Sequence, residues 1–251
     1  MIGLINLSHS DPLYMAFPSG ETVRNSAATN LKYVLEGRIE IGMVSLVSFI
    51  NNRDKLKLVK SINIHSRANT VSTLLVSRLN YLKENINVNV TSLTKTTELY
   101  MKLVLDRMGI PYQINESQYT DAINLSKTAD YALVIGDNAI EAYSGNLNIL
   151  MDIGLEFSKQ YNMYPVYAVA VALKDTDVDS SMVNYLNGRI EESKKYIKEA
   201  VKSNSMKFNV KEEVMREYYR NIDYSFNDPV MRTIEFIEGL SGEYKAKIAG
   251  H

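Results

Sequence analysis

The chain has 251 residues, a formal net charge of -1 and no cysteine. The lack of cysteine excludes disulfides, thiolate catalysis and cysteine-ligated metal clusters. A net charge this close to zero provides no overall field to attract nucleic acid or an acidic membrane surface. The hydrophobic share of 45% is that of a globular protein with a sizeable core.

The sequence lacks the patterns typical of membrane-spanning, secreted and zinc-dependent proteins. No run of about 18 apolar residues is present, so we expect no membrane-spanning helix. The first 13 residues have no charged lead, and Asn6 interrupts their apolar run, which argues against a secretory signal. The histidines His9, His65 and His251 show neither HExxH nor paired spacing. We therefore expect a cytoplasmic protein that works without a metal or a cofactor.

The apolar pattern predicts strands that alternate with helices. In chain order it predicts a strand at Ile2–Leu7, a loop at His9–Pro12, a helix at Thr29–Leu35, and strands at Ile39–Ile50, Leu56–Ile64, Val71–Ser77 and Asn87–Val90. It continues with a helix at Thr94–Met108, a strand at Tyr112–Ile114, helices at Tyr119–Leu125, Asn138–Tyr143 and Gly154–Tyr161, and a strand at Val166–Leu173. Charged, amphipathic helices follow, including Lys211–Ile222 and Pro229–Leu240. This order predicts an α/β protein with a parallel or mixed sheet.

The segment 128–143 contains the clearest strand, turn and helix of the chain. A continuous apolar run, Tyr131–Ile135, is followed at once by Gly136 and Asp137. Ligands of open α/β sheets bind at the carboxyl ends of strands. The motif therefore predicts a small-molecule crevice near Gly136, where the Asp137 carboxylate either binds a ligand hydroxyl or caps the following helix.

Hydroxyl side chains supply the next candidates. Thr94, Thr96 and Thr97 open a predicted helix, and hydroxyls at a helix N-terminus favour a carboxylate ligand. The alternative is an ordinary N-cap made by Thr94. Ser72 lies on a predicted strand and either hydrogen-bonds a ligand or is satisfied by the local backbone. No GxSxG sequence surrounds a serine, so hydrolase chemistry has no support.

His9 and Ser10 follow the first predicted strand in a polar segment. The ordinary pKa of a histidine, about 6.5, suits general acid–base catalysis near neutral pH. His9 is therefore a candidate acid or base, and Ser10 a candidate ligand-binding group. The alternative is a histidine in a surface loop without a catalytic role.

Six short motifs occur along the chain in a fixed order. They are LSHSDPL at Leu7–Leu13, LEGRIEIGMV at Leu35–Val44, STLLVS at Ser72–Ser77, TSLTKTT at Thr91–Thr97, DYALVIGD at Asp130–Asp137, and DIGLEF at Asp152–Phe157 followed by PVYAVAVAL at Pro165–Leu173. Together they resemble the chorismate dehydratases, cytosolic enzymes of the futalosine route to menaquinone. The chain resembles a divergent member of that family. It is divergent because His9 stands where the family has an asparagine, and because the chain has no tryptophan.

The resemblance implies a two-lobed type II periplasmic-binding-protein-like fold, with mixed sheets flanked by helices and a ligand cleft between the lobes. Lobe one would comprise residues 1–74 and 172–251, and lobe two residues 75–171. The implied activity is that of a cofactor-independent carbon–oxygen lyase, which dehydrates chorismate to 3-[(1-carboxyvinyl)oxy]benzoate.

Site residues follow from the same resemblance. His9 and Ser72 would be catalytic, and the residues that bind a small anionic carboxylate would be Ser10, Thr94, Thr96, Thr97 and Asp137. No metal, nucleic acid or membrane insertion is expected. Two alternatives stay open: a solute-binding or sensor protein for small anions with the same fold, and the sister dihydroxynaphthoate-forming enzyme. The sister group typically opens with an S-P-C-P-N-D-T-like motif, whereas this chain has S-H-S-D-P.

Overall fold

The computed structural model describes residues 1–145 and 147–240. The chain forms two compact units. Unit 1 consists of Met1–His65, Val166–Ala200 and the segment that begins at Ile222, and unit 2 consists of Ser66–Pro165 and Val201–Asn221. The chain therefore passes from one unit to the other four times.

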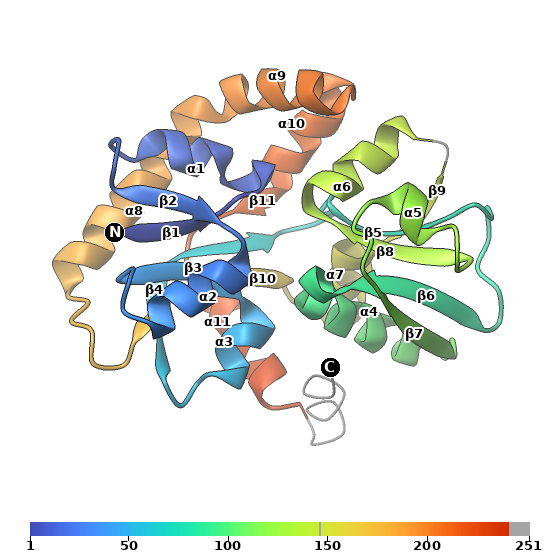
Figure 1. Cartoon of the computed structure of the whole chain (residues 1–251), viewed down its shortest axis with the longest axis horizontal. Helices are drawn as coiled ribbons and strands as arrows, with labels where there is room; N and C mark the ends of the chain where they lie inside the picture. The colour runs from blue at the N-terminus through green and yellow to red at the C-terminus, as the bar shows by residue number, and fades with distance from the viewer. Residues whose placement is uncertain (146, 241–251) are drawn as a thin grey trace. The chain divides into compact units, whose positions relative to one another are not determined.

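Unit 1 is built around a six-stranded mixed sheet with the strand order β11-β4-β10-β3-β1-β2 (Figure 1). These strands are β1 (Ile2–Ile5), β2 (Thr22–Asn25), β3 (Ile41–Ser45), β4 (Leu56–Ser66), β10 (Val166–Leu173) and β11 (Ile222–Asp223). β1 is parallel to β2 and β3, while β10 is antiparallel to both β3 and β4. The carboxyl ends of β1, β2, β3 and β4 therefore lie at one edge of this sheet.

Helices cover both faces of the unit 1 sheet. Figure 1 shows α2, α3 and α11 on one side and α1 with α8 on the other. Their bounds are α1 (Asp11–Ala16), α2 (Ala27–Leu35), α3 (Leu46–Asn51), α8 (Ser180–Ser193) and α11 (Asp228–Glu238). Glycines at Gly3 and Gly42 let α2 lie close to the sheet, since a Cβ on Gly3 would collide with the side chain of Asn30. Asn30 is buried and donates to the carbonyl oxygens of Leu4 and Met43 at 3.3 and 3.0 Å, which ties α2 to β1 and β3.

Unit 2 contains a five-stranded mixed sheet with the order β7-β6-β8-β5-β9. Its strands are β5 (Thr73–Ser77), β6 (Ile86–Thr91), β7 (Tyr112–Ser117), β8 (Tyr131–Ile135) and β9 (Asn148–Asp152). β6 is parallel to β7 and β8, and β5 is antiparallel to β8 and β9. The helices of this unit include α4 (Lys95–Met108), α5 (Ala122–Leu125), α6 (Gly136–Glu141), α7 (Ile153–Tyr161), α10 (Glu212–Asn221) and the part of α9 (Ile197–Phe208) that begins at Val201.

The core of unit 2 follows the two-residue period of its strands. Leu74, Val76, Ala132 and Val134 form one apolar cluster with residues of α5 and α6. α4 and α7 pack together, with the Tyr100 and Phe157 ring centroids 4.3 Å apart. Figure 1 shows α5 and α6 on one side of the sheet and α4 and α7 on the other. Both units thus have a mixed sheet covered by helices, which confirms the predicted α/β class.

Two predicted elements near the start of the chain are wrong. The predicted strand Ile39–Ile50 ends at Ser45, and α3 begins at Leu46. The Ser45 hydroxyl accepts a hydrogen bond from Ser48 N at 3.1 Å and so caps the helix. The predicted loop His9–Pro12 is a single turn of 3-10 helix, η1 (Ser8–Ser10), that leads directly into α1.

The predicted lobe boundaries also differ from the division seen in the structure. The divisions fall after His65 and Pro165, and the structure places Val201–Asn221 in unit 2 rather than in lobe one. Asn69 Nδ2 donates to Glu217 Oε1 at 2.7 Å, which joins α10 to the start of unit 2. An amphipathic pattern indicates that a helix buries one face. It does not indicate which of the two sheets the helix packs against, so the unit of Val201–Asn221 could not be predicted.

Candidate functional site

The turn that follows β1 carries the predicted residues of unit 1. Ser8, His9 and Ser10 make up η1, and all three are buried, with His9 8% exposed. Ser10 N donates to Leu7 O at 2.9 Å, which closes the turn. The alternative interpretation of His9 as a surface-loop histidine is therefore wrong. The turn lies at the carboxyl end of a parallel strand, where ligands of open α/β sheets bind.

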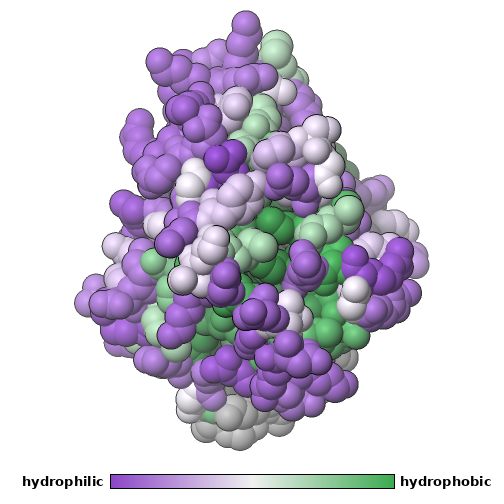
Figure 2. All heavy atoms as spheres, turned by 90° about the vertical axis from the view of Figure 1, so that its left-hand side faces the viewer, coloured by the Kyte–Doolittle hydropathy of each residue, from purple (hydrophilic) through white to green (hydrophobic). Residues whose placement is uncertain are grey.

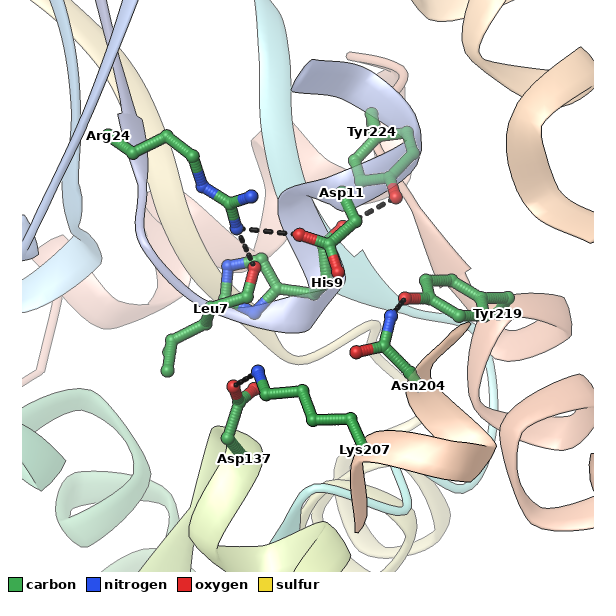
Figure 3. A network of polar contacts seen from close by, with 9 residues as sticks. All are labelled: Leu7, His9, Asp11, Arg24, Asp137, Asn204, Lys207, Tyr219 and Tyr224. Carbon is green, nitrogen blue, oxygen red and sulfur yellow. Dashed lines mark hydrogen bonds and ion pairs between the residues drawn. The ribbon is translucent and has the colours of Figure 1, made fainter. Parts of the chain in front are cut away.

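Two side chains from distant segments hold this turn (Figure 3). Arg24 Nη2 lies 3.1 Å from Leu7 O and 2.6 Å from Asp11 Oδ1, so it contacts the chain on both sides of His9. Tyr224 Oη donates to His9 O at 2.6 Å. Burial raises the pKa of the Tyr224 phenol, with the charges of Asp11 and Asp223 acting in the same direction. Tyr224 therefore stays a hydrogen-bond donor at neutral pH.

A second histidine belongs to the same network of unit 1. His65 lies at the end of β4, is fully buried, and has Nδ1 2.7 Å from Asn63 Oδ1. Asn63 Nδ2 donates to Tyr224 O at 3.0 Å, so the amide oxygen of Asn63 faces the imidazole. An acceptor oxygen at this distance assigns the proton to Nδ1 of His65. His65 was not among the site residues predicted from the sequence.

The predicted residues of unit 2 gather at one edge of its sheet. Thr73 is opposite Ile135 in the β5–β8 ladder, and Gly136 N donates to Ser72 O at 2.8 Å. Because β6 runs parallel to β8, its carboxyl end reaches the same edge, and η2 (Ser92–Thr94) contacts β8 there. The structure therefore brings the start of β5, the end of β8 and the start of α4 together. The side chains of Ser72, Thr94, Thr96 and Thr97 are buried, each 5% exposed or less.

Thr94 occupies the N-cap position of α4 but does not cap the helix with its side chain. Its hydroxyl donates to Thr91 O at 2.6 Å, and no side-chain hydrogen bond reaches an N–H of the helix from this residue. The alternative that the Thr94 side chain caps α4 is therefore wrong, although the residue does occupy the N-cap position. Thr96 and Thr97 lie in the first turn of α4, at the end of the helix whose dipole favours an anion.

Asp137 lies in the first turn of α6, close after the end of β8. The N-cap of α6 is Ile135, so the capping alternative for Asp137 is wrong. Its Oδ2 instead pairs with Lys207 Nζ of α9 at 2.8 Å (Figure 3). The Lys207 side chain is half exposed, whereas that of Asp137 is 22% exposed. This ion pair brings one positive and one negative charge to the predicted ligand-binding edge of unit 2.

Ser72 is positioned by its neighbour in the chain. Val71 has a positive φ of 66°, which is uncommon for a β-branched residue. Val71 N donates to Asp152 Oδ2 at 2.7 Å, and Asp152 Oδ1 accepts from Leu155 N at 3.0 Å as the cap of α7. Burial raises the pKa of Asp152, although these backbone donors favour its ionised form. Asp152 thus fixes the chain where it enters β5.

Each edge, taken by itself, carries groups with a chemistry of their own: an imidazole in unit 1, and hydroxyls and an ammonium in unit 2. Hydroxyl, imidazole and ammonium groups can bind carboxylates, and an imidazole can also give or take a proton near neutral pH. Within residues 1–145 and 147–240, no three His, Cys, Asp or Glu side chains come together in a way that could hold a metal ion.

Hydrophilic residues cover most of the face shown in Figure 2, with hydrophobic residues grouped near its middle. Among the helices that the structure describes, none is long and apolar enough to cross a membrane.

The chain is similar to a known protein family and to several solved structures. The family model described as menaquinone biosynthesis matches residues 1–240. Among solved structures, protein AF1704 from Archaeoglobus fulgidus is similar, with a TM-score of 0.73 and 14% identity, and the match covers 99% of this chain and 97% of that one. The periplasmic aliphatic sulphonate binding protein SsuA from Escherichia coli has a TM-score of 0.70 and 12% identity, with 97% and 86% covered.

A third solved structure has a ligand named with it. The alkanesulfonate-binding protein SsuA from Xanthomonas axonopodis pv. citri, bound to MOPS, has a TM-score of 0.68 and 10% identity, with 97% of this chain and 92% of that one covered. At such identities the likeness shows the fold. It confirms the predicted two-lobed, periplasmic-binding-protein-like architecture.

Proposed function

Because the chain belongs to the menaquinone-biosynthesis family, we propose that it is a cofactor-independent lyase that dehydrates chorismate to 3-[(1-carboxyvinyl)oxy]benzoate. The observation that carries this proposal is the family match over residues 1–240. The six motifs that resemble chorismate dehydratases, and the His9 turn at the end of β1, support this reaction within the family.

The chemistry requires few groups from the protein. A proton leaves the ring carbon that bears the enolpyruvyl ether, and the hydroxyl of the neighbouring ring carbon leaves as water. The ring becomes aromatic, and no electron acceptor or donor takes part. Aromatisation supplies much of the driving force, so the protein has to hold two carboxylates and position an acid and a base.

The residues at the two sheet edges can be given these roles. In unit 1, the His9 imidazole moves the proton and the Ser10 hydroxyl binds substrate. In unit 2, the Ser72 hydroxyl assists at the reacting ring. Substrate binding by unit 2 is assigned to Thr94, Thr96, Thr97 and Asp137. The Lys207 ammonium, which pairs with Asp137, is a further hydrogen-bond donor for a carboxylate at this edge.

The first experiment is to incubate the purified protein with chorismate and follow the products by chromatography and mass spectrometry. We expect a product that is lighter than chorismate by one water. Absence of turnover would contradict the proposal. His9→Ala should lower kcat by roughly 10²–10⁴-fold if the imidazole transfers the proton.

His9→Asn provides the matched variant, since it restores the residue typical of the family that the chain resembles. An inactive His9→Asn protein would support proton transfer by the imidazole. Full activity of His9→Asn would instead assign the position to hydrogen bonding and would contradict the role of His9 as acid or base.

Anion binding without chemistry is the second candidate. It is favoured by the similarity to two proteins named as binding sulphonates, since a sulfonate, like a carboxylate, is an anion held by hydrogen bonds. In that case chorismate would raise the melting temperature but would not be consumed. A ligand at 100 times its Kd stabilises the folded state by about 2.7 kcal/mol, which a thermal shift detects.

A further inference from the structure

The turn that carries His9 and Ser10 makes few backbone hydrogen bonds of its own. Leu7 N donates to Ile5 O and Ser10 N donates to Leu7 O, both at 2.9 Å, and Asp11 N donates to Ser8 O. The next element, α1, has six residues and begins at Asp11 without a side-chain cap. So short an element contributes little stability alone. The position of the turn therefore depends on side chains that reach it from other segments of unit 1.

Arg24 is placed to supply that support. It lies on the edge strand β2, and one nitrogen, Nη2, contacts both Leu7 O and Asp11 Oδ1. These two oxygens stand immediately before and after the η1 turn, so the guanidinium spans it. The Arg24 guanidinium also lies over the Tyr14 ring, with Cζ 5.1 Å from the ring centroid, which limits its movement. Asp11 and Arg24 are each about a quarter exposed, so the pair is partly shielded from water.

The Nε atom of Arg24 makes no hydrogen bond with the described residues that would hold the side chain elsewhere. This nitrogen is buried. A guanidinium held for stability alone would be expected to satisfy a buried N–H. The strong polar contacts of Arg24 are instead concentrated on the turn.

We propose that Arg24 is a positioning residue, which holds the Leu7–Asp11 turn so that His9 and Ser10 meet the substrate in a reactive geometry. This inference rests on the proposed lyase function. Arg24 acts through the turn and does not itself touch the reacting atoms. Misplacement of a reacting group by 1 Å can cost about 100-fold in rate. Loss of Arg24 should therefore lower turnover more than it weakens substrate binding.

The kinetic test compares Arg24→Gln and Arg24→Lys with Arg38→Gln. Arg38 is the matched control, because it is an exposed arginine of unit 1 that pairs with Glu36 and stacks on Tyr33. We expect Arg24→Gln to lower kcat by roughly 10- to 100-fold with little change in KM. Arg24→Lys should recover part of the rate, since an ammonium can donate to the same oxygens. Arg38→Gln should leave both constants unchanged.

A second measurement does not depend on turnover. Diethylpyrocarbonate modifies accessible histidines, and peptide mass spectrometry reports His9 and His65 separately. We expect Arg24→Gln to speed modification of His9 severalfold and to leave His65 unchanged, because His65 is held by Asn63. Asp11→Asn keeps the shape of the side chain but removes its charge. It should speed modification of His9 by a smaller factor, and it replaces Arg24→Gln in this test if that variant does not fold.

The two measurements separate the possible failures. Unchanged His9 reactivity and unchanged kcat in a folded Arg24→Gln protein would overturn the positioning role. Equal acceleration of His9 and His65 would also overturn it, because that result describes general loosening of unit 1. A third outcome separates the two proposals. If the wild-type protein does not turn over chorismate, the proposed reaction is refuted. If His9 alone is modified faster in Arg24→Gln, the role of Arg24 in holding the turn is still supported.

Discussion

Replacement of Tyr224 by phenylalanine tests the other contact that holds the His9 turn. The variant keeps the buried ring but removes the hydroxyl that donates to His9 O at 2.6 Å. A buried carbonyl that loses its donor costs about 1–3 kcal/mol. For a chain of this length, each 1 kcal/mol lowers the melting temperature by roughly 2–4 °C. We therefore expect Tyr224→Phe to melt several degrees below the wild type at neutral pH.

The pH dependence of this difference gives a sharper test. Burial raises the pKa of Tyr224 above its ordinary value of 10.0. The folded state then holds the phenolic proton more tightly than the unfolded state, so unfolding releases a proton in alkaline solution. The stability that Tyr224 supplies is fully present below pH 10 and is lost progressively as the pH rises above 10. Phenylalanine cannot titrate, so Tyr224→Phe does not share this loss.

Chemical denaturation between pH 7 and pH 11 measures both effects. The difference in unfolding free energy between wild type and Tyr224→Phe should be constant from pH 7 to 9 and should shrink above pH 10. Tyr33→Phe, in a partly exposed position of unit 1, is the control and should change little throughout. A difference that stays constant to pH 11 would refute the reasoning, because Tyr224 would then titrate alike in the folded and unfolded states.

Two further predictions concern unit 2. Replacing Thr96 and Thr97 by valine should weaken carboxylate binding, measured by calorimetry, without unfolding the protein; unchanged affinity would remove this turn from the site. Asp152→Asn should cost about 1 kcal/mol, because the amide leaves one of the N–H groups of Val71 and Leu155 without an acceptor. Since burial raises the pKa of Asp152 above 3.8, the stability that Asp152 contributes should fall as the pH rises from 3.8 through its folded-state pKa, so the difference in unfolding free energy between wild type and Asp152→Asn should narrow. Unfolding curves in which the gap widens with pH would contradict this sign.

Elements with both a strong apolar pattern and a local stop signal were predicted well. The strand Tyr131–Ile135 is β8, and the helix predicted to end at Met108 is α4. Gly109 ends that helix with a φ of 67°, a conformation that glycine adopts at little cost. Here the sequence alone contains both the element and its boundary.

Elements without such signals were missed. β2 is a four-residue edge strand, TVRN, whose residues are all half-buried, so neither alternation nor a continuous apolar run marks it. The segment 39–50 is mostly apolar, and periodicity alone cannot divide a buried strand from a buried helix. A single serine side chain, Ser45, determines where the strand gives way to α3.

Some residues of the candidate site could likewise be predicted from local sequence, and others could not. His9, Ser72, Thr96 and Thr97 could be proposed from the sequence because each lies near a predicted strand end, and strand ends can be read from the sequence. Arg24, Tyr224 and Lys207 were missed because each acts on a residue far away in the chain. Tyr224 is separated from His9 by 215 positions. No local pattern records such a contact.

The Tyr224 contacts also show why this site depends on the complete chain. Its hydroxyl binds His9 O, while its carbonyl accepts hydrogen bonds from the backbone and side chain of Asn63. One residue of the returning segment therefore joins the turn after β1 to the end of β4. The chain has by then entered unit 2 twice and come back to unit 1. Closing a contact of such high sequence separation costs the chain entropy of a long loop. The geometry of the His9 turn is thus a property of the finished fold of unit 1, and the short sequence around His9 does not determine it.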